Sequence, residues 1–421
     1  LEGGTVRITT ADVTGLGGII FPAGKTATLS SSKNVSFAGQ FLVNGAATID
    51  TDPNATISAT STLTGSGSIS KTGAGTLAFS ADNSGYSGTF SLEGGTILVQ
   101  NSSGLGSGDF TFASADVGTL TIDGSYSLVN NFILAGDGTV NITANSQATI
   151  SGVLSGSSTF TKTGAGRLTL SGVNTTSGAI AIQEGVILIT AINNLGDSNL
   201  VFPENSNGSL ETKGTLTTNK TVTLTGNGII DVEAGGSLTL SGLVSGNGRL
   251  TKHGSGTLVV TAANTYSGGT TIAQGILAVE SATALGTGGI HFSKRSAGVS
   301  ASITSSVSTS VNNTVLLEDS GTFTPASNTT LSLLQNISGV GTLVQNGAGT
   351  LLLAGANNTH GATEIRSGFL QIANNNSLGT GALSFAASGT GTLQLVTTPL
   401  AANITISNPV NFTGDGIIEI A

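Results

Sequence analysis

The octapeptide Ser-Lys-Thr-Gly-Ala-Gly-Thr-Leu at residues 70–77 recurs along this chain. It returns as Thr-Lys-Thr-Gly-Ala-Gly-Arg-Leu at 161–168, as Thr-Lys-His-Gly-Ser-Gly-Thr-Leu at 251–258 and as Val-Gln-Asn-Gly-Ala-Gly-Thr-Leu at 344–351. Its second glycine is found at intervals of 91, 90 and 93 residues, as Gly75, Gly166, Gly256 and Gly349. Self-similarity at a fixed period is the signature of a repeat architecture.

A second marker has the same period. A phenylalanine that follows a Leu-Gly turn recurs at intervals of 91, 90, 90 and 93 residues, as Phe21, Phe112, Phe202, Phe292 and Phe385. Because the composition does not change between copies, we expect a single continuous solenoid over residues 1–421, with a unit of about 91 residues present about 4.6 times. The expected divisions are a partial unit 1–21, repeat units of about 22–112, 113–202, 203–292 and 293–385, and a partial unit 386–421.

Short apolar bursts within each unit predict strands. Thr257-Leu-Val-Val-Thr261 and Gly275-Ile-Leu-Ala-Val279 are typical: apolar and polar residues alternate, and Gly, Asn, Asp or Ser separates one burst from the next. Helical spacing of apolar residues is not sustained over ten residues anywhere. We therefore predict an all-β fold, a right-handed parallel β-helix with about 22–25 residues per coil and about 18 coils. Glycine and asparagine are expected at its corners in left-handed backbone conformation.

Composition excludes several classes of protein. With 13 Lys+Arg against 22 Asp+Glu the net charge is −9, which argues against nucleic-acid binding. The absence of cysteine excludes a disulfide framework, a cysteine-based zinc site and a thiol nucleophile. No apolar run reaches the roughly 18 residues of a membrane helix, so no transmembrane segment is expected in this chain.

Few residues suggest a site. The three histidines, His253, His291 and His360, stand apart in the sequence, and a metal site needs three converging ligands. We interpret them as solvated corner residues and expect no metal and no cofactor. The dispersed aspartates are expected to cap turns through their side chains.

Two charged positions recur with the repeat. Periodic charge of this kind has two interpretations: solvated turn residues inherited with the repeat, or a stripe that binds anionic glycans. We favour the first, because the lysine position becomes Gln345 in the fourth copy. The recurring positions are Lys71, Lys162 and Lys252, and Glu2, Glu93 and Glu184.

One segment departs from the repeat. Residues 293–313 are rich in serine, and we expect a loop there. Acid–base catalysis on a polysaccharide needs converging carboxylates, or a carboxylate with a base. The densest irregular charge, and so the best candidate for such a site, consists of His291, Lys294, Arg295, Glu318 and Asp319. We favour the loop over a catalytic site, and we expect no catalytic residue.

A longer motif resembles a known family. Asn264-Thr-Tyr-Ser-Gly-Gly-Thr-Thr-Ile272, followed by Gly275-Ile-Leu-Ala-Val279 and preceded by Lys252-His-Gly-Ser-Gly-Thr-Leu258, closely resembles the passenger-associated transport repeat of Gram-negative autotransporters. The motif covers about 35 residues of each unit. Its related copies begin at Asn83, Asn174, Asn264 and Asn357.

The resemblance implies a function. It implies a secreted β-helical passenger domain at the extracellular cell surface of a Gram-negative bacterium, non-catalytic and often an adhesin. It also implies a precursor with a signal peptide and an outer-membrane β-barrel. The partner would then be a host or matrix surface ligand, such as a glycan, or copies of the chain itself. A self-assembling structural subunit of an extracellular filament, sheath or surface layer is the alternative, and a β-helical polysaccharide lyase or hydrolase is a third option.

Overall fold

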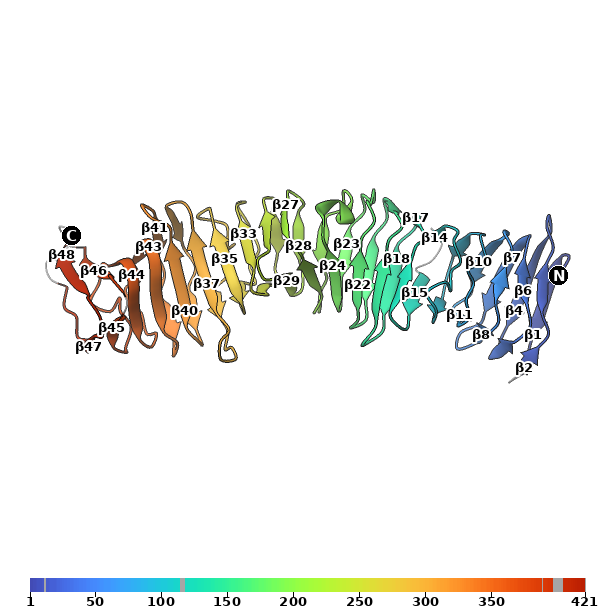
Figure 1. Ribbon diagram of the computed structural model, residues 1–421, viewed down its shortest axis with the longest axis horizontal. Helices are drawn as coiled ribbons and strands as arrows, with labels where there is room; N and C mark the ends of the chain where they lie inside the picture. The colour runs from blue at the N-terminus through green and yellow to red at the C-terminus, as the bar shows by residue number, and fades with distance from the viewer. Residues whose placement is uncertain (11–12, 114–117, 388, 397–403, 421) are drawn as a thin grey trace. The chain divides into compact units, whose positions relative to one another are not determined.

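The computed structural model describes residues 1–10, 13–113, 118–387, 389–396 and 404–420. The chain forms two compact units: Leu1–Val201 with Ser206–Leu210, and Phe202–Asn205 with Glu211–Ala421. Both units consist of short strands joined by turns (Figure 1). In the described residues the only helix is the single 3-10 turn η1 (Ile192–Leu195), and none has the length and hydropathy of a membrane span.

The first unit contains strands β1 to β24. They are β1 (Gly4–Ile8), β2 (Val13–Leu16), β3 (Ile19–Phe21), β4 (Thr26–Ser31), β5 (Val35–Phe37), β6 (Phe41–Val43), β7 (Ala46–Thr51), β8 (Thr56–Ala59), β9 (Leu63–Thr64), β10 (Ser68–Thr72), β11 (Thr76–Phe79), β12 (Phe90–Leu92), β13 (Thr96–Val99), β14 (Phe110–Phe112), β15 (Gly118–Ile122), β16 (Tyr126–Leu128), β17 (Phe132–Leu134), β18 (Gly138–Ile142), β19 (Gln147–Ile150), β20 (Leu154–Gly156), β21 (Phe160–Thr163), β22 (Arg167–Leu170), β23 (Ile180–Ile182) and β24 (Val186–Ile189). The boundary falls in β25 (Leu200–Phe202) and β26 (Ser209–Thr212).

The second unit has the same construction. Its strands are β27 (Thr215–Thr218), β28 (Val222–Leu224), β29 (Gly228–Val232), β30 (Ser237–Leu240), β31 (Val244–Gly246), β32 (Leu250–His253), β33 (Thr257–Val260), β34 (Thr270–Ile272), β35 (Gly275–Val279), β36 (Ile290–Phe292), β37 (Ala301–Ser305), β38 (Thr309–Val311), β39 (Val315–Leu317), β40 (Gly321–Pro325), β41 (Thr330–Leu333), β42 (Ile337–Gly339), β43 (Leu343–Leu353), β44 (Thr363–Ile372), β45 (Leu383–Phe385), β46 (Thr392–Leu395), β47 (Val410–Phe412) and β48 (Ile417–Ile420).

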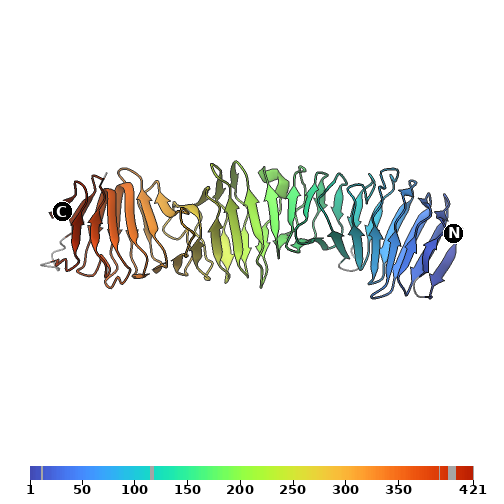
Figure 2. The same cartoon turned by 60° about the horizontal axis from the view of Figure 1, so that its bottom comes forward.

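Strands pair with the equivalent strand of the next coil, in parallel. In the first unit one ladder runs β1-β4-β7-β10-β12-β14-β17-β20, and in the second unit one runs β29-β32-β34-β36-β39-β42. Figure 2 shows the successive strands lying side by side within each unit. The predicted all-β parallel solenoid is confirmed, with about 18 turns.

The length of a coil varies with its corners. Register partners lie 20 residues apart where Phe90 is beside Phe110, and 27 apart where Leu383 is beside Val410. The prediction of about 22–25 residues per coil therefore lies inside a wider range. Asparagine does occupy left-handed corners, with φ of 65° at Asn54 and 66° at Asn145, as the turn-rich composition predicts.

The core of each unit is a column of inward side chains. Period-two burial along β18 puts Val140 and Ile142 inside, while Thr139 and Asn141 are only partly buried. Register then stacks like residues: the ring centroid of Phe110 lies 5.3 Å from that of Phe132 in the next coil. Burying a side chain of this size contributes roughly 2–3 kcal/mol, so the repeat gains stability coil by coil.

Candidate functional site

The lysine of the recurring octapeptide is buried at a corner of its coil. In three copies the lysine has no exposed surface, as Lys71, Lys162 and Lys252. The Nζ of Lys252 donates to the carbonyl oxygens of His253 at 2.7 Å, Gly254 at 2.6 Å and Gln274 at 3.1 Å. Lys71 and Lys162 make the same set, two bonds to the residues that follow and one to the next coil. We call this arrangement the lysine corner.

The lysine corner overturns the interpretation as solvated turn residues for the three lysines, whereas Glu2 and Glu184 are exposed. A stripe of lysines that binds anionic glycans is equally incompatible with it, because the ammonium groups are out of reach of solvent. Three N–H donors meet three carbonyl acceptors, so the ammonium is fully hydrogen-bonded. Burial lowers the pKa of Lys252 to about 8, and the nearby Asp231 carboxylate partly opposes that shift. The recurring charge therefore holds coils together.

The fourth copy reaches the same end with neutral groups. Gln345 is also fully buried, and its Nε2 donates to the carbonyl oxygens of Gly347 and Gly349, each at 3.1 Å. The hydroxyl of Ser367 adds a third donor, to the Gly347 oxygen at 3.3 Å. The loss of charge in this copy is thus a change of donor, and the two arrangements share one acceptor, the Gly347 carbonyl that is equivalent to that of Gly254.

Glycines make room for this corner. Gly185 has φ of +70°, and a Cβ there would lie 2.4 Å from the carbonyl oxygens of Gly164 and Gly166 and 2.9 Å from Lys162 Nζ. The second glycine of the octapeptide lies equally close to the coil before it. A Cβ would come within 2.1 to 2.4 Å of a backbone oxygen at each of its four positions, Gly75, Gly166, Gly256 and Gly349.

The asparagine of the longer motif links three successive coils. Asn264 Oδ1 accepts from the backbone N–H of Val244 at 2.8 Å, and its Nδ2 donates to the Ala284 carbonyl at 2.6 Å. Asn83 and Asn174 make the same pair of bonds. We call this the asparagine bridge.

In the fourth copy the bridge is displaced by one residue. The backbone N–H of Ile337 donates to Asn358 Oδ1, and Asn358 Nδ2 donates to the Ser377 carbonyl, both at 2.8 Å. Asn357, the residue that the aligned motif suggests, is exposed. The sequence has two adjacent asparagines here, and the structure shows that Asn358 points into the solenoid while Asn357 is exposed.

A buried side chain follows each bridge, and its identity varies. Tyr86 donates to the Gly67 carbonyl at 2.7 Å, and Tyr266 lies 2.6 Å from the Thr270 hydroxyl. In the fourth copy this place belongs to His360, which has no exposed surface and whose Nε2 lies 2.9 Å from Thr363 Oγ1. Its Nδ1 has no partner among the described residues, and burial lowers the pKa of His360 to about 4. The prediction of a solvated corner is therefore wrong for this histidine.

The recurring phenylalanines lie in the core at the ends of strands. All five are at most 1% exposed: Phe21, Phe112, Phe202, Phe292 and Phe385. Phe292 packs on Phe323 with ring centroids 5.6 Å apart. Glycine follows in the next coil because a Cβ at Gly138 would lie 2.5 Å from the ring of Phe112.

The irregular charged segment forms pairs between neighbouring coils. His291 Nε2 lies 3.1 Å from Glu318 Oε2, and the backbone N–H of Arg295 donates to Asp319 Oδ2 at 3.1 Å. The expected loop is shorter than predicted. β37 and β38 occupy 301–305 and 309–311, and the longest stretch of 293–313 outside strands is Ser293–Ser300.

Other candidate chemistry is sparse in the part of the chain that the structure describes. There, no three His, Asp or Glu side chains converge as a metal site would require. Asp82 accepts from the backbone N–H of Ser84 at 2.9 Å, which is the predicted turn cap, and this bond lowers its pKa. His253 lies 3.1 Å from Asp231 and is half exposed.

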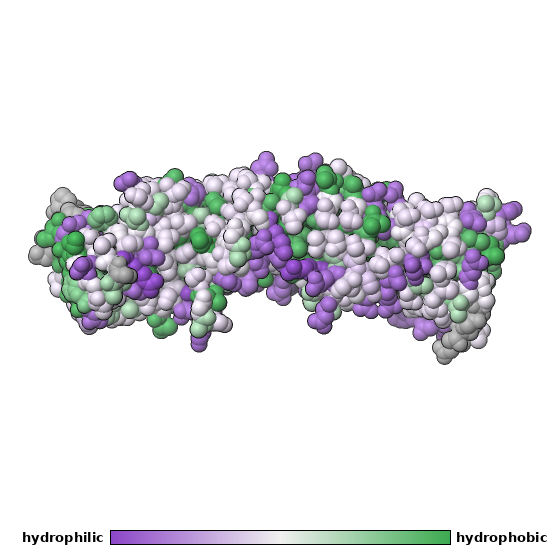
Figure 3. Space-filling view, in the orientation of Figure 1, coloured by the Kyte–Doolittle hydropathy of each residue, from purple (hydrophilic) through white to green (hydrophobic). Residues whose placement is uncertain are grey.

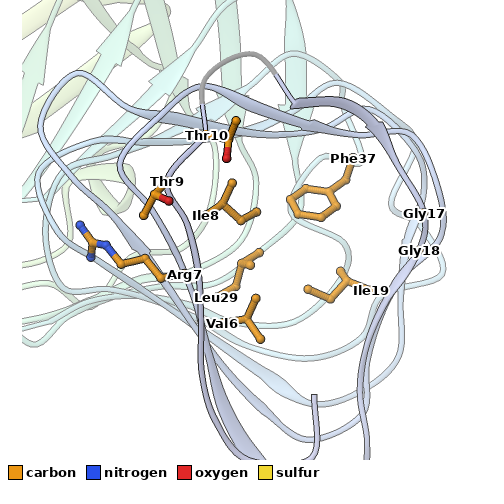
Figure 4. Close-up of a pocket in the computed structure, with 10 residues that line it drawn as sticks. All are labelled: Val6, Arg7, Ile8, Thr9, Thr10, Gly17, Gly18, Ile19, Leu29 and Phe37. Atoms are coloured by element: carbon orange, nitrogen blue, oxygen red, sulfur yellow. The ribbon is translucent and has the colours of Figure 1, made fainter.

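A pocket of about 520 Å³ opens into the core of the first unit beside β1. Figure 4 shows Val6, Ile8, Ile19, Leu29 and Phe37 around it, an apolar lining that continues the core. Among the described residues of the lining Arg7 is the one charged residue, and it is paired with Asp52. These described residues do not form the pair of titratable groups that acid–base catalysis requires.

Comparison with known families matches the passenger-associated-transport-repeat at residues 69–99, 160–189, 250–279 and 343–372. Each match runs from the strand with the lysine corner, or its glutamine counterpart, to the strand after the next glycine turn. The chain is also 35% identical over 119 residues to the protein named adhesin BmaC autotransporter of Brucella suis biovar 1 (strain 1330). That match covers 28% of this chain and 3% of the Brucella protein. No solved structure matches. The chain thus carries four repeats of the passenger-associated-transport-repeat kind on a parallel β-solenoid, and these repeats support an autotransporter passenger domain.

Proposed function

We propose that this chain is a surface-displayed, non-catalytic passenger segment and that its role is adhesive. The observation that carries the proposal is the placement of the repeat's polar groups. The lysine corners and asparagine bridges are buried and bind backbone groups of adjacent coils. The repeat thus builds a scaffold, and its outward Thr and Ser faces are free to vary.

The surface fits a display scaffold. Figure 3 shows an exterior of mostly intermediate hydropathy with separate hydrophilic and hydrophobic groups. The adhesin name of the Brucella relative supports an adhesive role, although the chain spans only 3% of that protein. The four passenger-associated transport repeats support a location at the Gram-negative cell surface and an outer-membrane partner in the precursor.

The distribution of charge supports a non-catalytic role. In the irregular segment Glu318 lies against His291, and Asp319 accepts from the backbone N–H of Arg295 and lies 3.9 Å from its guanidinium. A lyase or glycosidase needs carboxylates that converge on one substrate bond. Here Glu318 and Asp319 instead each pair with a different basic residue of the coil below.

Adhesion of displayed cells tests the proposal. Cells that display the chain should attach to immobilised matrix glycoproteins or glycans more than cells that display an unrelated passenger at equal surface density. The purified chain on beads should reproduce this attachment. Equal attachment of both cell types would refute the adhesive role. Imaging of the purified chain over a concentration series then separates the alternative, since ordered polymers would favour a structural subunit.

A further inference from the structure

An outward groove in the second unit has the chemistry of a ligand site. It lies across the outer faces of β34, β36 and β39, where register puts Thr271 beside His291 and His291 beside Leu316. The groove has a volume of about 270 Å³, and Arg249 and Thr314 also line it. It is unrelated to the lysine corners, which point into the solenoid.

The hollow arises from missing side chains. Gly268 and Gly289 contribute backbone alone to the lining, and a Cβ on Gly289 would lie 2.9 Å from Thr314 Oγ1. Thr271 is short and 8% exposed. Larger side chains stand around this floor, so a ligand in the groove would meet polar groups on its sides and the aliphatic surface of Leu316.

Arg249 is the reason to expect an anion. Its guanidinium is exposed and makes one long hydrogen bond, 3.5 Å to Thr271 Oγ1. Within the described ranges it has no carboxylate partner, whereas Arg7, Arg295 and Arg366 each lie against an aspartate or glutamate. A planar guanidinium with unused N–H groups matches a carboxylate in two-point geometry.

The opposite wall can serve hydroxyl groups. His291 lines the groove, and Glu318 lies beside it, half exposed, with its Oε2 3.1 Å from the imidazole Nε2. A carboxylate accepts hydrogen bonds from hydroxyls, and the threonine hydroxyls can donate or accept. Glu318 would also repel a doubly charged anion more than a singly charged one.

The groove belongs to one copy of the repeat. The polar residues of the groove are not part of the repeat motif, because the positions equivalent to Arg249, Thr271 and His291 carry other residues in the other three copies. The equivalents are Ser68, Ser91 and Thr111 in the first copy, Thr159, Ala181 and Val201 in the second, and Thr342, Glu364 and Ser384 in the fourth.

We propose that this groove binds a uronic acid unit of an acidic glycan, with Arg249 on the carboxylate, Thr271 and Thr314 on ring hydroxyls, and Leu316 under the ring. The proposal names a ligand class for the adhesive role and rests on that role for its biological meaning. The binding itself is a property of the purified chain and is measured without cells.

The test is ligand-observed NMR titration of the purified chain with methyl β-D-glucuronide and with neutral methyl β-D-glucoside. Wild type should bind the glucuronide and not the glucoside. Arg249→Gln should weaken binding at least about tenfold, since a charge-assisted hydrogen bond contributes about 1.5–3 kcal/mol. The matched control is Arg366→Gln, an arginine of the same unit that is paired with Glu364. It should leave the affinity unchanged.

Three outcomes would overturn the proposal: no glucuronide binding by wild type, equal binding of the glucoside, or an equal loss in both variants. Circular dichroism of each variant shows whether it is folded. Failure here with cell attachment intact rejects the groove alone. Glucuronide binding without cell attachment rejects the adhesive role alone.

Discussion

Replacing Lys252 by methionine tests what the lysine corner does. The change keeps an unbranched side chain of similar length but leaves the carbonyl oxygens of His253, Gly254 and Gln274 without a donor. Each buried acceptor left alone costs about 2 kcal/mol, so about 6 kcal/mol is lost. Removing the buried charge returns about 3 kcal/mol, the equivalent of the pKa shift from 10.5 to about 8. The expected net destabilisation is about 3 kcal/mol.

The glutamine variant provides the matched control. Lys252→Gln reproduces the donor that Gln345 supplies in the fourth copy, whose amide bonds the equivalents of Gly254 and Gly256, so of the three carbonyls only that of Gly254 keeps a partner. Two carbonyls and the amide oxygen remain alone, the bond to Gly256 returns about 1 kcal/mol, and with the charge removed the expected cost is about 2 kcal/mol. Urea unfolding at neutral pH, followed by circular dichroism, measures both variants. Amide hydrogen exchange over residues 250–275 locates the effect, because repeat proteins can unfold in steps.

The same corner predicts a dependence on pH. The pKa of Lys252 is lower in the folded chain, about 8, than its ordinary value of 10.5, so above pH 8 the unfolded chain binds more protons. Stability should therefore rise from pH 8 towards pH 10, and it should rise less in Lys252→Met. Above pH 10 the buried tyrosines, whose pKa values burial raises, reverse the trend. A methionine variant as stable as wild type, or a glutamine variant as damaged as the methionine one, would refute this account.

Three further changes follow from the buried contacts. His360→Tyr, which restores the residue found in two other copies, should remove a loss of about 3 kcal/mol in unfolding free energy between pH 6.5 and pH 4, because the folded pKa is about 4; unchanged acid sensitivity would contradict this. Asn358→Ala should cost about 2–4 kcal/mol in urea unfolding and Asn357→Ala less than about 0.5, since only the first side chain bridges coils; similar costs would rule the bridge out. Phe292→Ala should cost about 3–5 kcal/mol in the same assay, and a cost under about 1 kcal/mol would mean that the stacked core contributes little there.

The fold was accessible from the sequence because each coil repeats a local pattern. The alternating burial along β18 follows from its sequence, in which a polar residue separates Val140 from Ile142. Because the neighbouring strand β15 alternates in the same way, its apolar side chains stack on those of β18. The corner asparagines were predictable for a similar reason, since Asn54 needs only its own turn to adopt a left-handed backbone. The variation in coil length could not be predicted, because corners of different lengths are compatible with the same strand register.

The candidate site was much less accessible. In sequence Lys252 is a charge in a glycine-rich turn, and such a charge is ordinarily solvated; its burial depends on Gln274, 22 residues away, presenting a carbonyl from the next coil. The groove at Arg249 is likewise formed by four successive coils, and no local signal links Arg249 to His291 or Thr314.

The sequence by itself determined the period, the strand class and the repeat motif, because these depend on residues that are neighbours in the chain or recur at a fixed spacing. Tertiary structure alone decided which polar groups are buried and which face solvent. The physical reason is that side chains at these corners find their partners in the coil above or below, about 20 or more residues away, where a single displacement such as Asn358 for Asn357 changes the partner without changing the composition.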